Sequence, residues 1–140
     1  MSDRRRHLGI IELGSICADM RARNIDLFEQ LGHWVVDTPE PSLQRLFGEA
    51  SHLHAWHAEL WAQRAPVIPP VELDTSVAAP PAALVDQADR ATIYGAALDR
   101  LLTELSELRD PIDELLDPST IRTISLVTAD LAALRRRLRA

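Results

Sequence analysis

The chain of 140 residues lacks lysine altogether and contains one cysteine, Cys17. A single cysteine excludes an internal disulfide framework and favours a reducing compartment. No apolar run approaches the ~20 residues of a membrane helix. The segment after Arg4–Arg6 is interrupted by Glu12 and Asp19, so we predict no export signal. We expect one domain with its own core, located in the cytoplasm and not attached to a membrane.

Because lysine is absent, arginine supplies all 15 basic residues against 21 acidic ones. Seven of the arginines lie near the two ends of the chain: Arg4, Arg5, Arg6, Arg135, Arg136, Arg137 and Arg139. The middle is therefore strongly acidic, which argues against a nucleic-acid partner. Arginines in the last turn of a C-terminal helix complement its dipole, which gives the second group a structural explanation.

The common catalytic sequence motifs are also missing. The chain has no nucleophile elbow, phosphate-binding loop, dinucleotide-binding glycine pattern or His-Glu-x-x-His zinc motif. This removes the most frequent enzyme classes from consideration and leaves open whether the protein is an enzyme.

Apolar residues recur at three- and four-residue steps along most of the chain, which predicts helices. We expect helices over about residues 8–36, 41–64, 82–108 and 118–139. Residues 65–81 are rich in proline and carry no helical stripe, so we predict a semi-rigid connector there. The connection between the first two helices, residues 37–40, is short, which predicts that they form an antiparallel hairpin. The fold class is therefore all-α: an antiparallel four-helix bundle of ferritin-like connectivity, with a long Pro-rich crossover between the second and third helices.

The run from Gly48 to Trp61 holds three of the five histidines. At ~100° per residue, an apolar stripe through Leu46, Leu53, Trp56 and Leu60 would turn Glu49 inward and place His57 near the inner edge. On the same phase, His52 and Glu59 share a flank, and His54 points mostly outward.

An inward carboxylate needs a partner, because burying an unpaired charge is costly. We predict a candidate binding or acid/base site formed by Glu49 and His57 with Asn24, Gln87 and Tyr94. The alternative interpretation is structural: Glu49 would then be a buried carboxylate paired with His57, Asn24 or an arginine. His52 and Glu59 would form a surface ion pair.

Metal binding is a second interpretation of the same run. Glu49 and His52 match the Glu-x-x-His spacing of ferritin-like carboxylate proteins. An unorthodox set of Glu49, His52, His57 and Glu59 would then hold iron or another transition metal. The remaining helices offer no second Glu-x-x-His, so the usual dimetal ligand set is incomplete and we expect no cofactor.

The chain resembles the ferritin-like superfamily, and within it small uncharacterised bacterial members. The resemblance rests on residues 31–34 (LGHW), 51–61 (SHLHAWHAELW) and 121–130 (IRTISLVTAD). It implies a four-helix bundle and, in active relatives, a dimetal centre that performs oxidation or hydroxylation. Only Glu49 and His52 match the ligand pattern that the resemblance implies.

We expect a bundle without a complete dimetal centre that binds a partner protein or a small molecule. The alternative is a metal-dependent oxidoreductase or hydroxylase of the iron type, using the unorthodox ligands. A third hypothesis is a structural homodimer that packs through Trp34, Trp56 or Trp61, because tryptophan is enriched at interfaces.

Overall fold

A computed structural model describes residues 9–66 and 89–139 of the chain. Within these ranges it consists of four helices: α1 (Ile10–Asp37), α2 (Pro41–Arg64), α3 (Arg90–Arg109) and α4 (Pro118–Arg139), and no strand is present there. The all-helical prediction is confirmed. None of the four described helices has a stretch long and apolar enough to cross a membrane.

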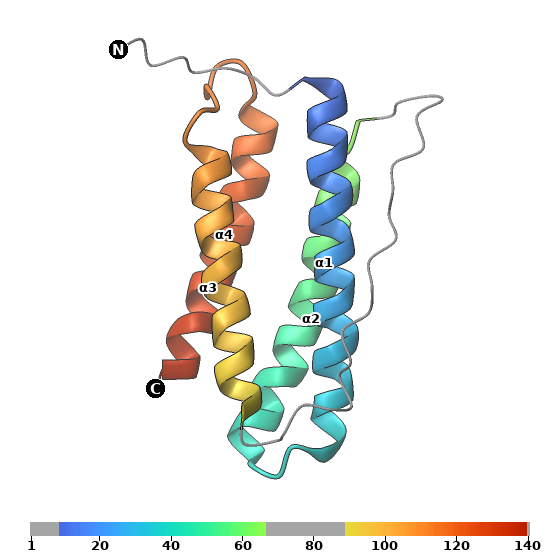
Figure 1. Cartoon of the computed structure of the whole chain (residues 1–140), viewed down its shortest axis with the longest axis vertical. Helices are drawn as coiled ribbons and strands as arrows, with labels where there is room; N and C mark the ends of the chain where they lie inside the picture. The colour runs from blue at the N-terminus through green and yellow to red at the C-terminus, as the bar shows by residue number, and fades with distance from the viewer. Residues whose placement is uncertain (1–8, 67–88, 140) are drawn as a thin grey trace.

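The helices form two antiparallel pairs that lie side by side (Figure 1). α1 and α2 make one hairpin, and α3 and α4 make the other. α2 ends at one end of the bundle and α3 begins at the other, so these two helices run in the same direction (Figure 1). The predicted crossover, residues 65–81, and residues 82–88 of the predicted third helix fall largely outside the described residues.

Proline and aspartate set the helix ends where the sequence predicts them. Pro41 occupies the first turn of α2, where its missing N–H costs nothing. At the start of α4, the Asp117 carboxylate accepts the backbone N–H of Thr120 and a hydrogen bond from Arg64. Burial alone would raise the pKa of Asp117, but the bonds from Thr120 and Arg64 hold it below its usual value.

Small residues let α1 and α2 approach closely. They recur at three- and four-residue steps along one side of α2: Gly48, Ser51, Ala55, Ala58 and Ala62. The Ser51 hydroxyl donates to the backbone carbonyl of Phe28 at 2.7 Å, and a Cβ on Gly32 would lie 3.5 Å from the Ser51 oxygen. The distance between packed helices depends on the side chains at the contact. This stripe therefore fixes the side of α2 that faces α1.

The observed phase of α2 differs from the predicted one. Trp61 is fully buried, whereas Trp56, predicted on the inner stripe, has 50% of its surface exposed. The inner face runs through Phe47, Ala50 and His54. Leu53 and Leu60 are only partly buried against the core. α2 therefore has a second, outer apolar edge, and sequence periodicity alone selected that edge as the core.

Trp61→Ala and Trp56→Ala form a matched pair on one helix and test this phase. We expect Trp61→Ala to lower the free energy of unfolding by about 3–5 kcal/mol, because it empties a core site. Trp56→Ala should cost about 1 kcal/mol, since half of the side chain already contacts water. Urea unfolding of dilute protein measures both. Equal losses, or a larger loss for Trp56→Ala, would show that the phase is wrong.

Candidate functional site

A chain of polar side chains crosses the core and joins three helices. His54 on α2 contacts Asn24 on α1 through Nδ1 at 2.8 Å and Tyr94 on α3 through Nε2 at 2.7 Å. Asn24 in turn donates from Nδ2 to the backbone carbonyl of Met20 at 2.8 Å. All three polar side chains are buried. Each hydrogen-bonding group of the His54 ring therefore has a partner, as a buried imidazole requires.

The bond to Met20 determines which atom of the network donates. Because the Asn24 amide nitrogen donates to that carbonyl, its Oδ1 atom is the acceptor toward His54. The proton of the neutral imidazole then resides on Nδ1, and Nε2 accepts from the Tyr94 hydroxyl. The network has one consistent direction, from Tyr94 through His54 and Asn24 to the α1 backbone.

Burial keeps this network neutral. Desolvation, with a smaller contribution from neighbouring His57, lowers the pKa of His54 from 6.5 to about 3. Desolvation likewise raises the pKa of Tyr94 far above its usual range. At neutral pH the core therefore holds an uncharged imidazole and an uncharged phenol. Neither group is poised to exchange protons near pH 7.

A second contact joins α2 to α4. Nε2 of the buried His57 lies 2.9 Å from the Asp130 carboxylate, whose side chain is 41% exposed. Burial lowers the pKa of His57 more than its hydrogen bond to Asp130 raises it, so at neutral pH a neutral N–H donates to the carboxylate. Nδ1 of His57 has no hydrogen-bond partner among the described residues. The rings of His54 and His57 meet edge to face, 6.0 Å apart.

The predicted candidates are only partly brought together. Asn24, His57 and Tyr94 face the core, as predicted. Glu49 does not: its side chain is 51% exposed and forms an ion pair with Arg137 at 2.5 Å. The prediction that the Glu49 carboxylate points into the core is therefore wrong, and so is the structural alternative in which it is a buried carboxylate. Gln87 lies outside the described residues.

His54 is the residue that the sequence prediction missed. It was expected to point outward and is instead the centre of the buried network. The stripe of small residues on α2 was the available signal, because the side that packs closely on α1 fixes where His54 points. His52 and Glu59 are both exposed, as predicted. The predicted ion pair between them is absent from the described residues, and Glu59 instead accepts a hydrogen bond from Gln63.

The predicted metal ligands do not converge. Glu49, His52 and Glu59 lie on the surface, while His57 faces the core. Both ring nitrogens of His54 already have partners, so this ring has no lone pair free for a metal without losing a bond. No three histidine, cysteine, aspartate or glutamate side chains of residues 9–66 and 89–139 are placed to hold a metal ion together. These residues do not fit the dimetal centre that a ferritin-like bundle implies.

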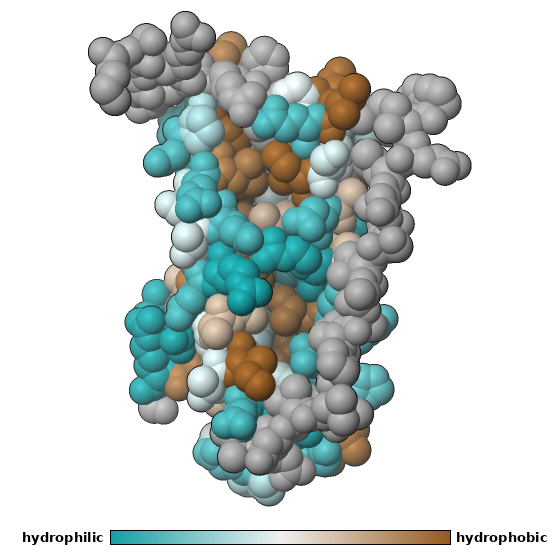
Figure 2. Space-filling view, in the orientation of Figure 1, coloured by the Kyte–Doolittle hydropathy of each residue, from teal (hydrophilic) through white to brown (hydrophobic). Residues whose placement is uncertain are grey.

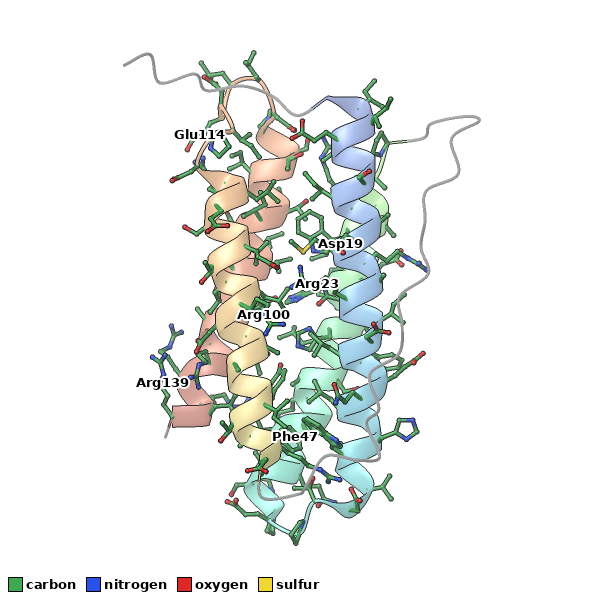
Figure 3. The ribbon with its side chains drawn as sticks, viewed as in Figure 1. Asp19, Arg23, Phe47, Arg100, Glu114 and Arg139 are labelled. Carbon is green, nitrogen blue, oxygen red and sulfur yellow. The ribbon has the colours of Figure 1, made fainter. Side chains whose placement is uncertain are left out.

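A groove of about 280 Å³ opens between α1 and α3, on the face seen in Figure 2. Ile16, Met20 and Leu108 supply its apolar part. Arg23 on α1 forms an ion pair with Glu104 on α3. Figure 3 shows the Arg23 side chain extending from α1 toward α3. The remaining polar lining is Ser15 and Asp19. The groove therefore combines an apolar floor with a small number of polar groups, as ligand sites do.

Asp19 is the least engaged charge of this groove. Its carboxylate lies 3.5 Å from the Arg23 guanidinium, and its side chain is 60% exposed. That separation is too long for a good hydrogen bond, whereas Glu104 holds the same guanidinium tightly. Ser15 is one helical turn from Asp19 and on the same face. Together they offer a hydroxyl and a carboxylate to a ligand.

Comparison of the chain with family models, curated proteins and solved structures finds no match at any of the three levels.

The neutral histidines make stability depend on pH. Unfolded histidine takes up a proton below about pH 6.5, but folded His54 does so only near pH 3. The stabilisation that neutral His54 adds to the free energy of unfolding is therefore complete above pH 6.5 and is lost as the pH falls toward 3. Between pH 7.5 and 5.0 we expect His54 to account for a loss of about 2 kcal/mol, at about 1.4 kcal/mol per pH unit.

Urea unfolding at the two pH values, compared with His54→Leu, checks this expectation. The variant should lose the share of the pH dependence that His54 contributes, about 2 kcal/mol between the two pH values, and keep the share of His57, whose pKa is also lowered by burial. Phe47→Leu serves as the control, because it weakens the core beside the network without removing a titratable group. A His54→Leu protein with the wild-type pH dependence would contradict the assignment.

A double-mutant cycle tests the Tyr94–His54 bond. Tyr94→Phe leaves Nε2 of His54 buried without a donor, so the free energy of unfolding should fall by about 1–3 kcal/mol. In the His54→Leu background the same change should cost at least 0.5 kcal/mol less, about the smallest coupling expected for residues in contact. Additive losses would show that the two side chains do not interact.

Proposed function

We propose that this chain is a binding module on a ferritin-like bundle without a dimetal centre, and that its ligand is a small molecule held in the α1–α3 groove. The observation that carries the proposal is the combination of an apolar floor with the loosely paired Asp19 carboxylate. The metal-dependent alternative receives no such support, because its predicted ligands lie apart. The single cysteine favours the cytoplasm as the location.

The groove favours a particular chemistry in its ligand. Ile16, Met20 and Leu108 contribute apolar surface, which gains free energy when an apolar group covers it. Glu104 neutralises Arg23, which leaves the Asp19 carboxylate as the uncompensated charge of the lining. An ammonium group can bind Asp19 and Ser15 while the ligand body covers the floor. The ligand class is therefore a small organic cation with an apolar body.

The size of the groove limits the ligand. A volume of about 280 Å³ is just below the range typical of sites for drug-sized molecules. A probe with about nine non-hydrogen atoms that gains about 0.3–0.5 kcal/mol from each, well below the ceiling of about 1.5, binds with about −3 to −4.5 kcal/mol. The expected dissociation constants of simple probes are therefore on the order of 1 mM, which corresponds to about −4 kcal/mol.

A titration with 2-phenylethylamine followed by backbone amide NMR tests the proposal. We expect saturable shifts at residues 15–23 and 104–108, and binding about tenfold weaker for Asp19→Asn. The neutral 2-phenylethanol should bind about tenfold more weakly than the amine, because it matches the shape and lacks the charge.

Glu29→Gln is the matched control variant, since it removes an exposed carboxylate from α1 outside the groove. It should leave the affinity for the amine unchanged. Equal affinities for the amine and the alcohol would refute the cation site. Shifts outside the groove would refute its location.

A further inference from the structure

The α1–α3 groove contains a cation of its own, the guanidinium of Arg23. One nitrogen of this group, Nη1, contacts both the Glu104 carboxylate on α3 and the Asp19 carboxylate on α1. Neither contact is longer than 3.5 Å, so the two carboxylate oxygens lie within twice that distance of each other. Figure 3 shows Asp19 and Arg23 one turn apart on α1. Arg23 therefore contacts both carboxylates of the groove lining at once.

The two carboxylates share the guanidinium unequally. Glu104 makes the closer contact with Arg23, and its side chain is 38% exposed, against 60% for Asp19. Because short charge-assisted contacts are the strong ones, Glu104 is the main partner of Arg23. The lining then keeps one negative charge for a ligand, on Asp19. Glu104 therefore determines whether Asp19 is available, although a ligand bound to Asp19 does not need to touch Glu104.

The guanidinium also repels a bound ligand cation. A hydrogen bond between an ammonium group and a carboxylate is about 2.8 Å long, and Arg23 lies 3.5 Å from the Asp19 oxygen. The ligand cation on Asp19 is therefore within one Debye length of Arg23, about 8 Å at physiological ionic strength, so salt does not screen the repulsion fully. Asp19 compensates for one ligand charge. A second charge has no free carboxylate in the lining, because Arg23 already occupies Glu104.

We infer that Arg23 limits the groove to ligands with one positive charge, and that Glu104 is the positioning residue that keeps Asp19 free for this charge. The inference rests on the proposed function and narrows its ligand class from organic cations to monocations. A diamine would bring its second ammonium group to the position that the Arg23 guanidinium occupies. Repulsion of the wrong ligand is a general source of specificity. Removal of Arg23 therefore converts the groove into a site for two charges.

The bundle does not depend on Arg23 alone to hold α3 against α1. At the start of α3, the buried Arg90 donates hydrogen bonds to Asp37 and Thr38 at the end of α1. The Arg23–Glu104 pair is partly exposed, and such pairs contribute little to folding stability. Variants at either position should therefore fold, and their amide NMR spectra check this.

Titrations with butylamine and 1,4-diaminobutane, followed by the amide NMR shifts of the groove residues, test the inference. The two probes differ by one ammonium group. The wild type should bind the diamine no more tightly than the monoamine. Arg23→Gln should bind the diamine about tenfold more tightly than the monoamine, because the second ammonium group can then bind Glu104.

Arg100 requires a control of its own. It lies one turn before Glu104 on α3 and could pair with Glu104 once Arg23 is removed. The Arg23→Gln measurement is therefore repeated in the Arg100→Gln background. Arg100→Gln alone is the matched control, since it removes an exposed guanidinium that does not line the groove. It should keep the wild-type preference. A control that gains the diamine preference would overturn the inference, because net charge alone would then set the preference.

Glu104→Gln tests the positioning role. Without Glu104 the guanidinium is free to neutralise Asp19, so butylamine should bind about tenfold more weakly. Adding Arg23→Gln to this variant should restore the affinity, because the lining again holds one uncompensated carboxylate. Glu107→Gln removes an exposed carboxylate of α3 outside the lining and is the matched control. It should leave the affinity unchanged.

Equal probe preferences in the wild type and in both Arg23→Gln proteins would overturn the inference. A Glu104→Gln protein with the wild-type affinity would overturn it as well. Either result leaves the proposed function standing if the wild type binds 2-phenylethylamine in the groove. A wild type that binds no amine there refutes the proposed function, and the inference with it.

Discussion

The position of His54 constrains the whole bundle. Each ring nitrogen of a buried imidazole that lacks a hydrogen-bond partner costs about 1–3 kcal/mol of desolvation free energy. Both nitrogens therefore need a partner at the same time. Asn24 satisfies one and Tyr94 the other, and they come from different helices. This condition fixes the rotation of α2 relative to α1 and places α3 at a definite height. Apolar packing alone tolerates more variation, because hydrophobic contact has no direction.

Arginine joins the helices at their surfaces and ends. Arg90, at the start of α3, is buried against the Trp34 ring and donates to Asp37 and Thr38 at the end of α1. Arg135 donates two hydrogen bonds to Asp99. Its guanidinium lies 2.9 Å from where a Cβ on Gly95 would stand. Such forked, planar contacts suit arginine and not lysine. The use of arginine in place of lysine therefore has a structural reason in these contacts. The sequence had suggested only that arginines complement the dipole of the C-terminal helix.

The sequence predicted the helices well because their signals are local. Proline and aspartate mark the starts of α2 and α4, and periodic apolar residues fill the helices between. The inward positions of Asn24 and Tyr94 followed from the same periodicity. The phase of α2 was wrong because this helix has apolar residues on two sides: one faces the core through Trp61, and the other is the edge that holds Trp56. A two-sided pattern has no single best face, and only the neighbouring helices decide between them.

That one rotation explains the difference between the expected and the observed site. Turning α2 moves Glu49 to the surface and brings His54 into the core, so the buried polar centre becomes neutral instead of anionic. A neutral, fully bonded centre fixes the helices relative to one another, because each of its hydrogen bonds has a direction. In this centre both ring nitrogens of His54 are hydrogen-bonded to other side chains of the protein. His54 therefore has no free donor or acceptor with which to bind a ligand. Recognition must then rely on polar side chains that are not fully bonded within the protein, such as Asp19 in the α1–α3 groove.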